Sequence, residues 1–144
     1  MRALELSAIR VNVEVNTWQD AVRAAGELLV INGHAKPSYV DGMIALATKL
    51  GPYIVMTPGV AIPHARPEDG AIDVGFAAVK LAKPIAFGNK DNDPVYIVLA
   101  FCTPSAEAHI EMLSELADRL GKDDLLERII AAETVEDLTA IFKA

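Results

Sequence analysis

The amino-acid sequence predicts an α/β protein in which a central β-sheet is covered by helices. The chain has 144 residues, of which 52% are hydrophobic, so it is long enough to bury one core. Segments with the alternation of β-strands stand among segments with helical spacing, and helices are expected before, between and after the strands. We therefore predict a single domain over residues 1–144, with the order of its strands left open.

A strand and two helices are predicted in the first third of the chain. Apolar and polar residues alternate over residues 9–15, as in a half-buried strand. Thr17 can cap a helix that ends at Gly33. Pro37 can open a second helix, which the Gly-Pro pair at 51–52 ends.

Further strands are predicted in the middle of the chain. Short apolar runs at 53–57 and 60–62, separated by a Pro-Gly break, predict a strand or a strand pair that leads into a loop. Residues 74–81 and 95–101 predict two more strands, with the turn-rich stretch GNKDNDP between them.

The last third of the chain is predicted to be helical. Thr103 can cap a helix that has Pro104 at its first position and ends at Gly121. Two shorter helices follow, LLERIIAA and TVEDLTAIFKA, and the second can be capped by Thr134 together with Asp137.

The composition excludes several classes of function. A net charge of -7 argues against non-specific nucleic-acid binding and against docking on anionic membranes through a basic patch. The longest aliphatic stretch, 95–101, is far shorter than the roughly 20 residues that span a bilayer, and the first residues carry no signal peptide. We therefore expect a cytoplasmic protein with no membrane insertion.

Cys102 is the only cysteine, so neither an internal disulfide nor a thiolate zinc cluster can form. A phosphocysteine site would need a glycine-rich anion loop and an arginine in a Cys-x5-Arg pattern, and both are missing after Cys102. We expect Cys102 to be a buried residue at a strand end.

The strongest candidate for chemistry is His64, in the run GVAIPHARPEDG. Prolines and glycines around it make the loop stiff, and an apolar strand leads directly into it. A histidine is largely neutral at cell pH, so one ring nitrogen can attack phosphorus while the other donates its proton to a nearby carbonyl. A stiff loop helps such a nucleophile because it holds the ring in line with the incoming group.

The run GVAIPHARPEDG closely resembles the phosphorylation-site segment of the IIA components of the sugar phosphotransferase system (PTS), mannitol/fructose class (EIIA type 2). The longer run GPYIVMTPGVAIPHARPEDG is most similar to the ascorbate-specific branch of that class. The resemblance covers nearly the whole chain, since TWQDAVRAAGELLV, DNDPVYIVLAF and AHIEMLSELADRL also match in order.

By this resemblance the sheet is mixed and flanked by helices, His64 is phosphorylated, through Nε2, and His109 is the second histidine of the site. The function implied is that of a phosphotransferase-system phosphocarrier. It would accept phosphate from the carrier protein HPr and pass it to a cysteine of the IIB component, and the membrane IIC component would import an ascorbate-like sugar. No metal and no organic cofactor are implied.

His109 also has a physical reason to take part. It falls within about two turns of the predicted start of its helix, where free N–H groups and the helix dipole favour an anion such as a phosphoryl group. Arg66 can pair with phosphate oxygens or with an acidic side chain of a partner protein, or it can be a solvated charge of the loop, and these alternatives stay open. Glu68 and Asp69 are expected at the loop surface, because carboxylates would repel a phosphoryl group.

Two questions stay open at this point. Met56, Val60 and Ile62 could form an apolar docking surface near the site or belong to the core. The same fold could also serve as a regulatory module whose phosphorylation state controls partner proteins. A metal-binding or hydrolytic site is disfavoured, because the three histidines show no recognisable ligand or triad spacing.

Overall fold

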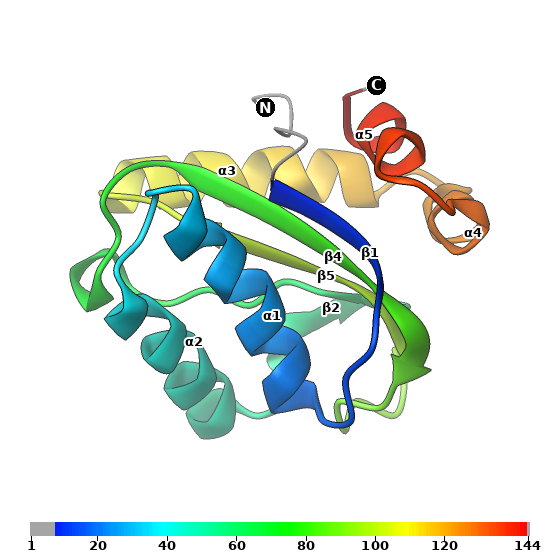
Figure 1. Ribbon diagram of the computed structural model, residues 1–144, viewed down its shortest axis with the longest axis horizontal. Helices are drawn as coiled ribbons and strands as arrows, with labels where there is room; N and C mark the ends of the chain where they lie inside the picture. The colour runs from blue at the N-terminus through cyan, green and yellow to red at the C-terminus, as the bar shows by residue number, and fades with distance from the viewer. Residues whose placement is uncertain (1–7, 144) are drawn as a thin grey trace.

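A computed structural model describes residues 8–143, and its core is one five-stranded sheet (Figure 1). The strands are β1 (Ile9–Val13), β2 (Val55–Thr57), β3 (Val60–Ala61), β4 (Gly75–Ile85) and β5 (Val95–Cys102). Their order across the sheet is β1-β4-β5-β3-β2. The β1–β4 and β3–β5 pairs are parallel, whereas β4–β5 and β2–β3 are antiparallel. The mixed sheet implied by the family resemblance is confirmed.

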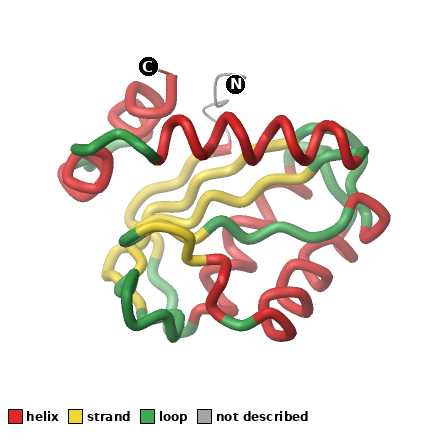
Figure 2. The backbone as a smooth tube through the Cα atoms, turned by 180° about the vertical axis from the view of Figure 1, so that it is seen from behind, coloured by secondary structure: helices red, strands yellow, loops and turns green. Residues whose placement is uncertain are grey.

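Five α-helices cover the two faces of this sheet within the described residues. They are α1 (Trp18–Ile31), α2 (Pro37–Leu50), α3 (Ala106–Leu120), α4 (Leu125–Ala131) and α5 (Val135–Lys143). Helices α1 and α2 lie over one face (Figure 1), and Figure 2 shows α3 crossing the other face. Among residues 8–143, no helix combines the length and the apolar character needed to cross a bilayer.

The two layers bury separate apolar clusters, one on each face of the sheet. The cluster under α1 and α2 contains Tyr39 and Met43 together with alternate residues of β4 and β5. The other, under α3, α4 and α5, contains Phe101 and Leu116. Strand β5 is buried on both faces, which explains why its sequence is a continuous apolar run rather than an alternating one.

The helix ends that the sequence predicts are mostly confirmed. Thr17 caps α1, accepting a hydrogen bond from the Asp20 N–H at 3.2 Å. Pro37 is the first residue of α2. Thr134 accepts the Asp137 N–H at 3.1 Å before α5, and the Asp137 carboxylate accepts the Thr134 N–H in return. These caps are local hydrogen bonds, so sequence is sufficient to find them.

The predicted start of α3 at Thr103 is wrong. Strand β5 runs to Cys102, and Thr103 is still buried at the end of that strand, 2% exposed. The cap is Ser105, whose hydroxyl accepts the Ala108 N–H at 3.2 Å. Thr103 and Ser105 offer the same capping chemistry two residues apart, and only the exit of the chain from the sheet chooses between them.

Two short strands at one edge of the sheet precede the loop that carries His64. The predicted pair at 53–57 and 60–62 is confirmed as the antiparallel strands β2 and β3, with a 3-10 turn over Pro52–Ile54 before them. The ladder between β3 and β5 ends at the pair formed by Ala61 and Val98. Residues after Ala61 therefore run beside β5 without strand pairing, and they carry His64.

Candidate active site

The His64 imidazole is held by the backbone of its own loop. Its Nδ1 lies 3.1 Å from the carbonyl oxygen of Ile62, which can only accept a hydrogen bond. The proton therefore sits on Nδ1, and Nε2 carries the free lone pair. Burial lowers the pKa of His64 below its ordinary value; the Ile62 carbonyl opposes this shift, and the nearby His109 adds to it. His64 is thus a neutral imidazole at neutral pH.

Two further rings surround His64. The ring centroid of Phe101 lies 5.0 Å from that of His64, with the planes nearly parallel at 23°. The His109 ring lies 5.0 Å from His64 at 65°, an edge-to-face arrangement, and 5.2 Å from Phe101. The fully buried Phe101 gives the imidazole a fixed apolar wall, so its orientation is set by packing as well as by hydrogen bonding.

His109 comes from the first turn of α3. Its N–H donates to the Ser105 carbonyl oxygen at 3.1 Å, so it is the first residue of the helix whose amide is bonded within the helix. The amides of Ala106 and Glu107 precede this first helical bond, at the positive end of the helix dipole. Burial lowers the pKa of His109 too. The structure therefore brings the two sequence-predicted site residues together beside a helix N-terminus.

Sequence reasoning did not find two residues that build this site. Phe101 stacks on His64, and the hydroxyl of the buried Tyr39 contacts the loop from the opposite face of the sheet. The sequence pattern around each of them indicates only a residue of the hydrophobic core. The one signal available for Tyr39 is its phenol on the apolar face of a helix, because a buried hydroxyl needs a polar partner.

Arg66 turns toward its own loop. Its Nη2 lies 3.4 Å from the Asp69 carboxylate, and the Asp69 carboxylate also accepts the Arg66 backbone N–H at 3.1 Å. The Arg66 side chain is 69% exposed. Asp69 is therefore a structural partner within the short turn Pro67–Asp69, while Glu68 is exposed as predicted.

The three candidate docking residues separate into two groups. Val60 and Ile62 are each 1% exposed and belong to the core under α3, α4 and α5. Met56 is 56% exposed on β2. Both residues of the inner strand β3 are buried, whereas β2 is an edge strand and leaves Met56 exposed. Val60 and Ile62 therefore do not belong to a contact surface.

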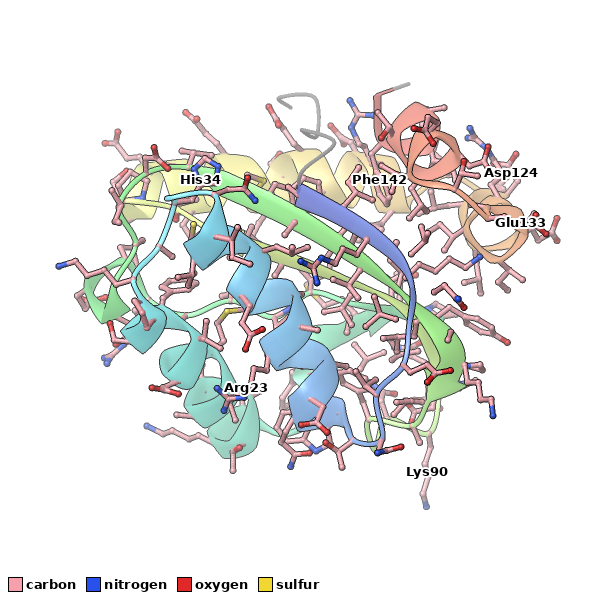
Figure 3. The ribbon with its side chains drawn as sticks, viewed as in Figure 1. Arg23, His34, Lys90, Asp124, Glu133 and Phe142 are labelled. Carbon is pink, nitrogen blue, oxygen red and sulfur yellow. The ribbon has the colours of Figure 1, made fainter. Side chains whose placement is uncertain are left out.

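Cys102 is a buried residue at the end of β5, as predicted. Burial raises the pKa of its thiol to about 12. It is packed beside His34, whose Nδ1 lies 2.6 Å from an Asp73 carboxylate oxygen. His34, labelled in Figure 3, belongs to the connection between α1 and α2. It is not part of the ring cluster formed by His64, Phe101 and His109.

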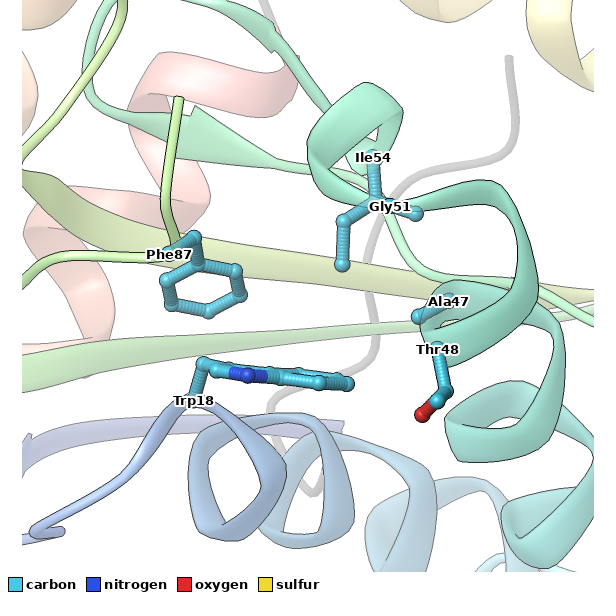
Figure 4. Close-up of a pocket in the computed structure, with 6 residues that line it drawn as sticks. All are labelled: Trp18, Ala47, Thr48, Gly51, Ile54 and Phe87. Atoms are coloured by element: carbon cyan, nitrogen blue, oxygen red, sulfur yellow. The ribbon is translucent and has the colours of Figure 1, made fainter. Parts of the chain in front are cut away.

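One cavity of the protein lies away from the rings of His64, Phe101 and His109. A cavity of about 160 Å³ is lined by Trp18, Gly51, Ile54 and Phe87, among others (Figure 4). Phe87 follows the end of β4 that pairs with Val95, whereas Phe101 is at the other end of β5. Over residues 8–143, no group of three or more His, Cys, Asp or Glu side chains is arranged to hold a metal ion.

The chemistry available at the ring cluster is that of a neutral nitrogen nucleophile. Nε2 of His64 has a free lone pair, and its ring is held by the Ile62 carbonyl on one side and by Phe101 beneath it. The N-terminal amides of α3 and the edge of His109 offer donors to an anion beside it. Such an arrangement fits the transfer of a group that carries negative charge, such as a phosphoryl group.

A family model and the relatives found by sequence similarity name the same kind of protein. A sequence model described as "Phosphoenolpyruvate-dependent sugar phosphotransferase system, EIIA 2" matches residues 2–144. The ascorbate-specific PTS system EIIA component of Shigella boydii is 36% identical over 135 residues, which are 93% of this chain and 88% of that relative.

Two solved structures are also similar. The mannitol-specific cryptic phosphotransferase enzyme IIA CmtB from Escherichia coli has a TM-score of 0.87 at 28% identity, over 97% of this chain and 95% of that one. A chain in the complex of enzyme IIAMTL and phosphorylated enzyme IIBMTL from Escherichia coli has a TM-score of 0.85 at 25% identity, over 97% and 96% of the two chains.

Proposed function

This chain belongs to the EIIA 2 family of the phosphoenolpyruvate-dependent sugar phosphotransferase system, and we propose that Nε2 of His64 is its phosphoryl acceptor. The proposed donor is the phosphorylated histidine of HPr, and the proposed acceptor of the next step is a cysteine of a IIB component. The observation that carries the proposal is the neutral His64 imidazole, with Nδ1 bonded to the Ile62 carbonyl and Nε2 free.

The first transfer exchanges one nitrogen–phosphorus bond for another. The Nε2 lone pair attacks phosphorus in line, the bond from phosphorus to the donor imidazole breaks, and the donor imidazole leaves with the electron pair of that bond. The His64 ring gains positive charge as the new bond forms. The Ile62 carbonyl oxygen, 3.1 Å from Nδ1, stabilises this charge through the Nδ1–H bond.

His109 acts on the phosphoryl oxygens in this proposal. Phosphoryl transfer depends mainly on positioning and on electrostatic stabilisation of charge spread over three oxygens. The His109 ring is 5.0 Å from His64 and stands at the first turn of α3, where backbone N–H groups favour an anion. Its role is to donate a hydrogen bond to the transferred group, and no metal or organic cofactor is required.

The second transfer links the chain to sugar uptake. The similarity to an IIA chain solved in complex with phosphorylated enzyme IIB supports a IIB partner. The identity to ascorbate-specific EIIA components supports an ascorbate-like sugar, although the membrane IIC component contributes largely to selectivity. The proposed location is the cytoplasm, where HPr and IIB meet the chain.

The experiment is phosphate transfer from labelled phosphoenolpyruvate through the general phosphotransferase proteins to this chain. Wild-type protein is expected to gain an acid-labile label, and His64→Gln is expected to gain none. His34→Gln is the matched control, because that histidine lies outside the ring cluster. Label that persists in His64→Gln would disprove the proposal.

A second stage separates a transport phosphocarrier from a regulatory module. Labelled chain is mixed with its IIB component, and transfer of the label to a IIB cysteine is expected. For His109→Ala, labelling is expected to survive while onward transfer slows or the phosphohistidine hydrolyses faster. Unchanged kinetics in His109→Ala would remove His109 from the mechanism.

A further inference from the structure

Tyr39 reaches the active-site loop from the opposite side of the sheet. It is the third residue of α2, and its side chain is 1% exposed within the cluster under α1 and α2. Its phenolic oxygen accepts the Ala65 backbone N–H at 3.0 Å. Its single proton can be donated to the Phe101 carbonyl oxygen at 2.9 Å, with the Ala65 carbonyl oxygen at 3.2 Å as the second acceptor within reach.

The Tyr39 hydroxyl lies where the pairing between β3 and β5 has ended. The parallel ladder of β3 and β5 ends at Ala61, three residues before His64, so strand hydrogen bonds no longer join the loop to β5. The Tyr39 hydroxyl bonds to both backbones beyond that point. One of its partners is the peptide that follows His64, and the other belongs to Phe101, whose ring stacks on the imidazole.

Two other contacts show that α2 packs tightly on this loop. The Ser38 hydroxyl donates to the Asp69 carbonyl oxygen at 2.9 Å. A Cβ at Gly42 would lie 3.3 Å from Ala65 Cβ and 3.1 Å from Asp69 Cβ, which is tighter than usual, so α2 approaches this loop closely. Of these α2 residues, only Tyr39 forms a hydrogen bond with Ala65, the residue adjacent to His64.

Burial raises the pKa of Tyr39 well above its ordinary value. The hydroxyl therefore stays protonated and can donate to a carbonyl while it accepts the Ala65 N–H. Removing the hydroxyl would leave the buried Ala65 N–H without this hydrogen-bond acceptor. A buried donor without an acceptor costs stability.

We propose that Tyr39 is a positioning residue: its hydroxyl fixes the peptide after His64 against β5 and so holds the imidazole on the Phe101 ring for phosphoryl transfer. This inference rests on the proposed function of His64, and it adds a residue on the far side of the sheet. Tyr39 never touches the phosphoryl group. It acts by limiting the freedom of the loop that carries the nucleophile, and an error of about 1 Å in such a position can slow a reaction about 100-fold.

The test compares Tyr39→Phe with wild type and with Thr139→Val. Phenylalanine keeps the shape of the core residue and removes only the hydroxyl. Thr139→Val removes another buried hydroxyl, which donates to the Val135 carbonyl oxygen at 2.8 Å in α5. It therefore controls for a general loss of stability.

In phosphate transfer from phospho-HPr, kcat of Tyr39→Phe is expected to fall about 10- to 100-fold with KM changed less than about twofold, because docking is unaffected. Thr139→Val is expected to keep the wild-type kcat. A kcat for Tyr39→Phe within about twofold of wild type overturns the inference, as does an equal loss in Thr139→Val.

A second readout needs no phosphate. In ¹⁵N spectra of the unphosphorylated protein, wild-type His64 is expected as a single Nδ1–H tautomer, because Ile62 fixes it. In Tyr39→Phe the two ring nitrogens are expected to shift toward each other as both tautomers become populated. If wild type gains no label, the proposed function fails while this readout still decides the role of Tyr39. An unchanged His64 tautomer in Tyr39→Phe then overturns it.

Discussion

The half-buried pair of His64 and His109 predicts a stability that depends on pH near neutrality. The perturbation is a fall in pH from 7.5 to 5. Burial lowers the pKa of both His64 and His109 in the folded protein, and the nearby His109 ring lowers the pKa of His64 further. In the unfolded chain both histidines return to a pKa of about 6.5, so the unfolded state binds more protons below that pH.

The sign follows from proton linkage. Each group contributes its full stabilisation above about pH 6.5, and that contribution is lost as the pH falls from there toward the folded pKa. For one proton the free energy of unfolding falls by at most about 1.4 kcal/mol per pH unit. Asp137, whose folded pKa is also lowered, loses its contribution only near and below its ordinary value of 3.8, outside this range.

The assay is urea unfolding at several pH values between 5 and 7.5, followed by far-UV circular dichroism. The comparison is between wild type and His64→Gln, because a glutamine amide can still donate to the Ile62 carbonyl. We expect the wild-type free energy of unfolding to fall more steeply with decreasing pH, with a slope larger than that of the variant by up to about 1.4 kcal/mol per pH unit. Groups outside the pair cancel in this difference.

Equal slopes in the two proteins would refute the reasoning, because they would mean that His64 titrates alike in the folded and unfolded chains. A direct check is the titration of His64 by NMR, where the folded pKa is expected below 6.5. In His109→Gln the His64 pKa is expected to rise, since one of the groups that lower it is gone. A fall instead would contradict the coupling of the two rings.

Two further predictions concern backbone conformation at two glycines and the burial of Cys102. Gly59 has φ +79, and a Cβ there would lie 2.5 Å from Leu126 Cδ1, whereas Gly33 has nearly the same φ, +78, and open space around it. Gly33→Ala is therefore expected to lower the free energy of unfolding by about 1 kcal/mol, and Gly59→Ala by about 1 kcal/mol more. Urea unfolding of the two variants measures both losses. Equal losses would show that the Leu126 contact has no effect. Burial raises the pKa of Cys102 to about 12, so alkylation by iodoacetamide at pH 8 is expected to be at least about 100-fold slower in the native than in the unfolded protein. Similar rates would show that the thiol is accessible.

The amino-acid sequence by itself determined the features that depend on neighbouring residues. Thr17 and Thr134 were found as helix caps because a capping hydroxyl bonds to an amide three residues away. The burial of Cys102 followed from its place at the end of a long apolar strand. The His64 loop was found because its prolines and glycines surround the histidine directly in the chain.

Tertiary structure decided the features that join distant segments. His64 and Phe101 are 37 residues apart in the chain, and Tyr39 comes from a helix on the other face of the sheet, yet all three meet at the end of β5. No local pattern specifies this meeting, because it depends on the order β4-β5-β3 and on the parallel register of β3 with β5. The same register ends the ladder at Ala61, which leaves the His64 loop to be held by the hydroxyl of Tyr39.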